Sequence, residues 1–157
     1  MTDLRPLIFI TNDDGITAKG IRSLYEAVAP FGDIVLIAPD SAQSGMGHAI
    51  TIDSTLYVKK MTIDLEDCGI EEYSCSGTPA DCIKLAVDQV YHRKPDFVFS
   101  GINHGSNASI NVLYSGTMSA AVEGAIEGIP SVGFSLMDYA HDANFEEGKS
   151  FLRKIIQ

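Results

Sequence analysis

Positive charge is scarce in this sequence. Its 157 residues include 11 lysines and arginines against 21 aspartates and glutamates, so the formal net charge is -10. A chain this acidic lacks the basic surface that binds nucleic acid or anionic membranes without specificity, and we expect neither a nucleic acid polymer nor a membrane among its partners. A small anionic substrate is compatible with this charge if a bound cation or backbone N–H groups hold it locally.

Cysteines and long apolar segments are scarce as well. Cys68, Cys75 and Cys82 cannot all pair within one chain, and their spacing matches no CxxC metal or redox motif. We therefore expect reduced cysteines that serve packing. No segment reaches the length of a transmembrane helix, and the N-terminus lacks the basic and apolar regions of a secretory signal. These two absences lead us to expect a cytoplasmic protein.

Buried strands and amphipathic helices alternate along the chain. Apolar runs predict buried strands at residues 7–10, 33–38 and 95–103, and residues 131–136 predict a further strand. Apolar residues at helical spacing predict helices, at residues 16–30, 79–91, 118–127 and 144–157. Strands joined by helices of this length form right-handed parallel units. The sequence therefore predicts an α/β fold with a mostly parallel sheet.

Three segments carry more specific expectations. Residues 49–60 alternate irregularly and favour a hairpin or edge strands, whereas residues 61–74 are rich in acidic side chains and predict a solvated excursion. The last helix, capped by Asn144, is expected to place four residues on its apolar face: Phe151, Leu152, Ile155 and Ile156.

Polar side chains follow three of the predicted strands. Asn12, Asp13 and Asp14 follow the first strand, Ser44 follows the second, and Asn103 ends the third. Ligands of open α/β sheets bind beyond the carboxyl ends of the strands, and two adjacent carboxylates repel each other unless a cation or hydrogen-bond donors offset the repulsion. These oxygen donors suit Mg²⁺ or Mn²⁺ and, without histidine or cysteine, suit zinc less well. The alternative for the first group is a turn that uses the residues only for their geometry.

A second polar group stands at the predicted start of a helix. Ser115, Gly116 and Thr117 offer N–H groups, hydroxyls and the positive end of a helix dipole to a phosphate, and Asn107 in the preceding loop can add a donor. The alternative is simple helix capping. Of the four histidines, His104 is the one to test first as a proton donor, since it adjoins the third strand's polar end.

Five stretches in a fixed order resemble the motifs of the SurE survival-protein family of 5′-nucleotidases. A lone Asn-Asp-Asp-Gly would be a weak match, but motifs spread from residue 11 to residue 117 make a specific one. The stretches are Thr11-Asn12-Asp13-Asp14-Gly15, Ala38-Pro39-Asp40 with Gln43-Ser44-Gly45, Ser76-Gly77-Thr78-Pro79-Ala80-Asp81-Cys82, Ser100-Gly101-Ile102-Asn103-His104-Gly105-Ser106-Asn107, and Tyr114-Ser115-Gly116-Thr117.

The resemblance implies a fold, an activity and a site. It implies a Rossmann-like three-layer α/β domain that hydrolyses nucleoside 5′-monophosphates, in some members also 3′-monophosphates or short polyphosphate, with one divalent cation per subunit in a homodimer or homotetramer. Asp13 and Asp14 are implied to be catalytic. The implied metal ligands are Asp13, Asp14, Ser44 and Asn103. The implied phosphate and substrate residues are Asn12, Asn107, Ser115, Gly116 and Thr117.

The sequence departs from this family in two ways. Ser109 stands where the family usually has glycine, and Lys19 where it often has proline. Family members also continue into a segment that exchanges between subunits, so we expect residues 1–157 to form one SurE-like domain that lacks this C-terminal oligomerisation segment.

Metal-assisted hydrolysis of a phosphomonoester is the leading hypothesis, with either water or Asp13 as the attacking group. One rival is a nucleotide-binding protein without turnover. Another is a phosphoacceptor signalling module, because paired aspartates after a first strand also begin receiver domains. That module needs an acceptor, for which Asp53 is the nearest residue, and a lysine at the end of a later strand, which is missing. Only fold-level analogy supports it.

Overall fold

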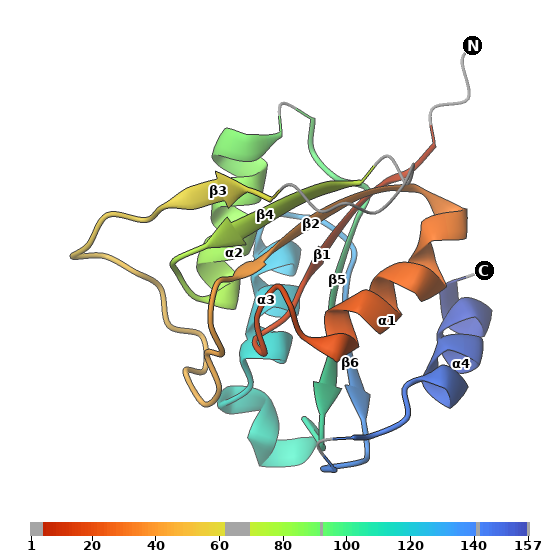
Figure 1. Ribbon diagram of the computed structural model, residues 1–157. Helices are drawn as coiled ribbons and strands as arrows, with labels where there is room; N and C mark the ends of the chain where they lie inside the picture. The colour runs from red at the N-terminus through yellow and green to blue at the C-terminus, as the bar shows by residue number, and fades with distance from the viewer. Residues whose placement is uncertain (1–4, 62–69, 92, 141, 157) are drawn as a thin grey trace.

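The computed structural model describes residues 5–61, 70–91, 93–140 and 142–156. Its centre is a six-stranded sheet with the strand order β3-β4-β2-β1-β5-β6 (Figure 1). Only β3 runs antiparallel to its neighbour, so the sheet is mostly parallel, as predicted. The strands are β1 (Leu7–Thr11), β2 (Asp33–Pro39), β3 (Val58–Lys60), β4 (Glu71–Cys75), β5 (Phe97–His104) and β6 (Ser131–Leu136).

Helices cover both faces of the sheet and complete three layers. In Figure 1, α1 and α4 lie on one face, and α2 and α3 on the other. Four α-helices and three short helical segments are described: α1 (Lys19–Val28), α2 (Pro79–Leu85), α3 (Gly116–Ile126), α4 (Glu146–Ile156), η1 (Ala29–Phe31), η2 (Ala86–Val90) and η3 (Ser109–Leu113). The predicted three-layer α/β architecture is confirmed.

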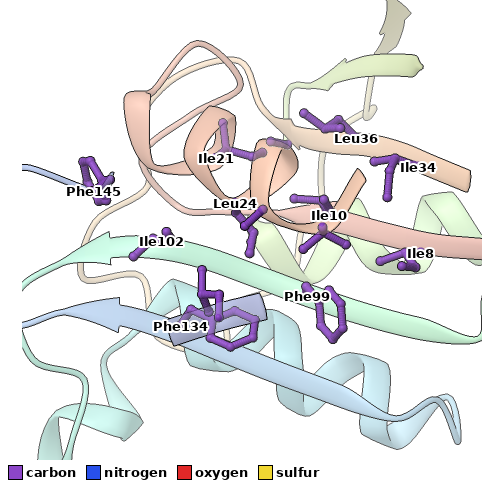
Figure 2. Packing of buried hydrophobic residues seen from close by; sticks show 14 of the residues in the cluster. Ile8, Ile10, Ile21, Leu24, Ile34, Leu36, Phe99, Ile102, Phe134 and Phe145 are labelled. Atoms are coloured by element: carbon purple, nitrogen blue, oxygen red, sulfur yellow. The ribbon is translucent and has the colours of Figure 1, made fainter. Parts of the chain in front are cut away.

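β1 is buried on both faces, which explains its unbroken apolar sequence. Ile8 and Ile10 point to the layer of α1 and α4, where Ile21 and Leu24 of α1 pack over them (Figure 2). Leu7 and Phe9 belong to the second core, beneath α2 and α3. Full burial of each such side chain contributes roughly 1.5–3 kcal/mol, so the strand that ends in the acidic turn is among the most firmly held.

Two predicted helices begin at other residues than expected. α1 begins at Lys19 because Ile16 still belongs to the turn, where its N–H donates to the Pro39 carbonyl at 2.9 Å. α3 begins earlier than predicted, at Gly116, since Ser115 caps it by accepting the Met118 N–H at 3.0 Å. The predicted cap of α2 is confirmed: the Thr78 hydroxyl accepts the Asp81 N–H at 3.2 Å.

The expectation of a solvated excursion is wrong for residues 71–74. They form most of β4, an internal strand between β2 and β3. Glu72 is buried there because its carboxylate pairs with the Arg22 guanidinium of α1. Residues 62–69 of that prediction lie outside the described residues. The predicted edge strand is confirmed only at Val58–Lys60.

The apolar face expected for the last helix is only partly buried. Leu152 is buried and Ile156 packs against the core, whereas Phe151 and Ile155 are 65% and 53% exposed. The expected cap is present, since the side-chain amide oxygen of Asn144, Oδ1, accepts the Glu146 N–H at 3.0 Å. In the ranges described, no helix is both long and apolar enough to cross a membrane.

Candidate functional site

The order of the strands places a crevice at the carboxyl end of β1. From β1 the chain moves outward to β2 and β4 on one side of the sheet, then crosses to β5 and β6 on the other. Such a reversal between two neighbouring strands, here β1 and β5, is where open α/β sheets bind their ligands. The polar residues that follow β1 and end β5 therefore stand where this fold presents ligand-binding groups.

An open cleft of about 370 Å³ lies at this place. It collects all four residues predicted as metal ligands, two of the five predicted phosphate residues and His104. Its lining residues are Asp13, Asp14, Ser44, Gly45, Asn103, His104, Ser106, Asn107, Asn111, Tyr114 and Ser115. Segments as far apart in sequence as Asp13 and Ser115 thus meet in one polar cavity.

A second cavity has the opposite character. It measures about 280 Å³ and is lined by apolar side chains, among them Phe31, Phe97, Val132 and Ile155. No ionisable side chain lines it. Hydrolytic or metal chemistry needs ionisable or strongly polar groups, so this apolar cavity is not a candidate site.

Asp13 is held rigidly at the floor of the cleft. Its side chain is only 5% exposed, and its Oδ1 accepts the Thr117 hydroxyl at 2.6 Å. Its carbonyl oxygen accepts the Gln43 N–H at 2.7 Å. A Cβ at Gly116 would lie 2.6 Å from the Asp13 Cβ, so only glycine allows α3 to begin this close to the carboxylate.

Asp14 carries a carboxylate oxygen that lacks a partner. Its Oδ2 is buried and accepts no hydrogen bond from the residues that the structure describes. Burial raises the pKa of Asp14, the neighbouring Asp13 charge raises it further, and His104 opposes both effects. A buried oxygen left unpaired beside a second carboxylate is costly. The donor set around it therefore fits a divalent, oxygen-ligated cation.

Asn103 and His104 approach the cleft from the end of β5. The Asn103 side-chain N–H donates to the His104 carbonyl at 2.9 Å, which leaves the amide oxygen available as a ligand. The His104 ring packs edge-to-face on Phe145, with 5.0 Å between centroids. Its Nδ1 is buried and, among the described residues, has no hydrogen-bond partner. Two of the remaining three histidines, His92 and His141, lie outside the described residues.

At the start of α3, the backbone N–H groups are available to a ligand, whereas the two hydroxyls already have partners within the protein. The Ser115 hydroxyl caps the helix, and the Thr117 hydroxyl is donated to Asp13. The N–H groups of Gly116 and Thr117 belong to the first turn, where a helix supplies no acceptor. Both predicted uses, capping and anion binding, are therefore open to this segment at once. The Asn107 side-chain N–H, predicted for phosphate, donates to the Ser135 hydroxyl at 2.9 Å.

Asn12 has a different environment from its two acidic neighbours. Its amide N–H donates to the Gly15 carbonyl at 2.9 Å, and its amide oxygen accepts the Gly15 N–H at 3.2 Å. Gly15 adopts a φ of 101°, which favours glycine. The turn interpretation thus describes Asn12, whereas Asp13 and Asp14 face the cleft. The substrate-binding role of Asn12 stays a prediction.

Three cleft residues beyond β5 had no role in the sequence-based prediction, although two of them stand in the quoted motifs: Ser106, Asn111 and Tyr114. They follow β5, in a loop rich in asparagine and serine that contains η3. A long polar loop after a buried strand was the available signal, because functional residues concentrate in loops that a rigid scaffold positions. Which of its side chains turn inward could not be inferred from composition.

Comparison with known proteins places this geometry in a family. The family model described as survival protein SurE matches residues 8–157. The chain is 61% identical over 155 residues to the 5′-nucleotidase SurE of Christiangramia forsetii and 60% identical over 155 residues to that of Flavobacterium johnsoniae. Each alignment covers 99% of this chain and 59% of the relative, so the chain spans about three fifths of their length.

A solved structure agrees with this assignment. The crystal structure of the SurE protein from Aquifex aeolicus superposes with a TM-score of 0.84 at 39% identity, over 96% of this chain and 58% of that one. Both the sequence motifs and the fold therefore lead to the same conclusion. The chain belongs to the SurE family.

Proposed function

We propose that the protein is a divalent-metal-dependent phosphomonoesterase that hydrolyses nucleoside 5′-monophosphates to nucleoside and phosphate. The observation that carries this proposal is the buried, unpartnered Oδ2 of Asp14, beside Asp13 in a polar cleft. Relatives that share 61% and 60% of aligned residues bear the name 5′-nucleotidase, which supports the substrate class.

The cation would be held by Asp13, Asp14, Ser44 and Asn103, which all line the cleft. Mg²⁺ and Mn²⁺ prefer such carboxylate, hydroxyl and amide oxygens, with water completing the coordination. The chemistry that the bound cation supplies is neutralisation of phosphate charge and activation of a water molecule.

Other groups of the chain would bind and protonate the substrate. The N–H groups of Gly116 and Thr117, at the positive end of the α3 dipole, would hold phosphate oxygens and stabilise charge that develops on them. His104, in the same cleft, would donate a proton to the leaving oxygen of the nucleoside.

Water is the favoured attacking group in this proposal. Asp13 already accepts the Thr117 hydroxyl on Oδ1, and a hydrogen bond to a carboxylate stabilises its charge and reduces its nucleophilicity. Rapid acid quenching of the enzyme during turnover of ³²P-labelled substrate tests this directly. If ³²P label remains bound to the protein at Asp13, then the aspartate, and not water, is the nucleophile.

The cleft also supports a nucleoside over a bare phosphate. Tyr114 lines it with a side chain that is 63% exposed. The backbone of this residue is fixed on both sides, since its N–H donates to the Asn111 carbonyl at 3.1 Å and its carbonyl accepts the Gly47 N–H at 3.2 Å. An exposed ring on a backbone held at both ends is suited to stack on a nucleobase, which is worth about 1–3 kcal/mol per base.

A phosphate-release panel tests the function. Substrates are nucleoside 5′- and 3′-monophosphates and short polyphosphate, each with Mg²⁺, Mn²⁺ or chelator. We expect cation-dependent release from 5′-monophosphates, and a fall of several orders of magnitude in Asp13→Asn while circular dichroism shows an intact fold. Unchanged turnover in Asp13→Asn would contradict the metal site.

The rival of a nucleotide-binding protein without turnover gives a different result in the same panel. Equilibrium dialysis would then detect bound nucleotide while no phosphate is released. The phosphoacceptor rival loses support, because Asp53 lies on an exposed loop and not in the cleft lining.

The remaining family properties are carried over as proposals. Activity on 3′-monophosphates or short polyphosphate, assembly into a homodimer or homotetramer, and a single domain over residues 1–157 rest on the resemblance, whereas a cytoplasmic location stays a prediction from the sequence. Light scattering of the 157-residue chain, compared with a full-length relative, tests the assembly.

A further inference from the structure

The loop that carries Ser44 runs from residue 40 to residue 57, between β2 and β3, and contains no helix or strand. It also contains two glycines at positive φ, Gly45 at 75° and Gly47 at 55°, directly after the predicted ligand. A backbone of this kind has little stiffness of its own. Two backbone hydrogen bonds flank Ser44: the Gln43 N–H donates to the Asp13 carbonyl at 2.7 Å, and the Gly47 N–H donates to the Tyr114 carbonyl at 3.2 Å. Neither bond involves Ser44 itself, so its position between them also depends on the side-chain contacts that tie the loop to the helices.

A buried carboxylate outside the cleft provides one such tie. Glu123 of α3 is only 3% exposed. Its Oε2 lies 2.8 Å from His48 Nε2, on the loop, and its Oε1 lies 2.5 Å from Lys84 Nζ, on α2. Because a buried charge is costly unless it is well paired, the ion pair with Lys84 and the hydrogen bond with His48 compensate this carboxylate. The Lys84 contact is electrostatic: Oε1 makes no hydrogen bond of good geometry to the described residues, so His48 is the hydrogen-bonded partner. The bond to Glu123 also raises the pKa of Lys84.

We propose that Glu123 and His48 form a clasp that positions Ser44 in the cation site, which makes His48 a positioning residue of the proposed reaction. The inference rests on the proposed function. His48 follows Ser44 by four residues, and the two glycines lie between them. Glu123 is on the helix whose first turn donates the Thr117 hydroxyl to Asp13. Helix α3 therefore positions both the Asp13 carboxylate and the loop that carries Ser44.

The rest of the loop is anchored independently of the clasp. Asp81 accepts the Thr51 N–H at 3.0 Å and the Thr51 hydroxyl at 2.7 Å, and the Thr78 hydroxyl donates to the Ala49 carbonyl at 2.7 Å. These bonds hold residues 49–51 to the start of α2. Loss of the His48 contact should therefore loosen the segment around Ser44 without releasing the whole loop.

Calorimetric titration with Mn²⁺ alone, without substrate, tests the clasp. We expect His48→Ala to raise the dissociation constant about 10-fold or more, the effect typical of residues that orient metal ligands. His48→Gln, whose amide can still donate to Glu123, should recover most of the affinity. Lys84→Met is the matched control: it removes the other partner of Glu123 but leaves the loop contact, and its affinity should stay near that of the wild type.

A double-mutant cycle shows whether the effect passes through Ser44. In a Ser44→Ala background, His48→Ala should cause little further loss of Mn²⁺ affinity, because the ligand that the clasp positions is already gone. Hydrogen exchange of the cation-free protein supplies a second readout. Amides of residues 44–47 should exchange faster in His48→Ala and at the wild-type rate in Lys84→Met.

The outcomes separate the clasp from the function on which it rests. Wild-type Mn²⁺ binding that His48→Ala leaves unchanged, or additive losses in the cycle, would overturn the clasp and leave the proposed function standing. Unchanged exchange at residues 44–47 in His48→Ala would overturn it too. A wild-type chain that binds no Mn²⁺ would overturn the proposed metal site, and the clasp with it.

Discussion

At the scale of single residues, the hydroxyl of Thr117 is the contact on which the site most depends. It donates to Asp13 Oδ1 at 2.6 Å, and both side chains are buried. Thr117→Val keeps the shape but leaves the carboxylate oxygen unpaired, which costs about 1–3 kcal/mol. We expect lower stability in urea denaturation and weaker Mn²⁺ binding, whereas Thr117→Ser retains both. A valine variant equal to the wild type would show that Asp13 does not need this donor.

The charge of Asp14 leads to a second residue-scale prediction. Burial raises its pKa above the ordinary 3.8, so the folded state binds this proton more tightly than the unfolded state. Stability of the cation-free protein should therefore fall as the pH rises from 3.8 through the folded-state pKa. Asp14→Asn removes that cost.

Thermal denaturation in chelator, over a series of pH values, measures the effect. Above the folded-state pKa we expect a higher midpoint for Asp14→Asn than for the wild type, and a smaller difference near pH 3.8, where the wild-type carboxyl is protonated. A variant less stable than the wild type at neutral pH would contradict the electrostatic account of Asp14.

The residues that line the cleft could be predicted from the sequence where they stand at the ends of predicted strands. Asp13, Asp14, Ser44 and Asn103 follow buried strands, and parallel strands bring such residues together. The hydrogen bond from the Thr117 hydroxyl to Asp13 could not be predicted from the sequence. In sequence, a helix cap, a phosphate ligand and a donor to a carboxylate 104 residues away have the same appearance.

At the scale of elements, the start of α1 explains one departure from the family. Lys19 is the first helical residue, and Ala18 before it has φ -65° and ψ 148°. A residue before proline prefers this extended conformation, and proline suits the first helical position because its missing N–H needs no partner there. The other departure also has a conformational counterpart, since Ser109 adopts a φ of 58°, where glycine is favoured.

Lys19→Pro should therefore stabilise the protein by roughly 0.4–1 kcal/mol, because proline restricts the unfolded chain and fits the folded one. Urea denaturation measures the change. Lys19→Ala is the control, since it removes the same positive charge from the helix N-terminus without restricting φ. A proline variant no more stable than the alanine variant would exclude the conformational effect.

The wrong prediction for β4 shows which information the sequence pattern of a single segment lacks. Glu71 and Glu72 suggested a solvated segment, yet Glu72 is buried by its pairing with Arg22, 50 residues earlier. A charged residue enters a sheet when a distant partner compensates it. Periodicity within the segment carries no information about such a partner, so the strand could not be inferred from it.

At the scale of the whole molecule, layers and parallel strands were predictable but the strand order was not. Alternating strands and helices specify a parallel sheet, whereas the position of β1 between β2 and β5 depends on where the chain crosses the sheet. That crossing brings residues after β1 next to Asn103 at the end of β5. The site is therefore a product of topology as much as of motif.

Cation binding should stabilise the whole chain through linkage. At a free Mn²⁺ concentration of 100 times the dissociation constant, a single site that exists only in the folded state adds about 2.7 kcal/mol. For a chain of this size that raises the melting midpoint by about 5–10 °C. Differential scanning calorimetry with and without Mn²⁺ measures the shift.

Nonspecific screening has to be separated from binding, because the net charge of -10 attracts any divalent ion. Screening acts on all surface charges and persists when one site is removed. The double variant Asp13→Asn/Asp14→Asn changes the net charge only from -10 to -8, but it removes both carboxylates of the cleft. If Mn²⁺ binds in the cleft, the Mn²⁺-induced shift in the melting midpoint disappears in this variant. A shift of equal size in the variant would show that it arises from screening and that the cation does not bind at these carboxylates.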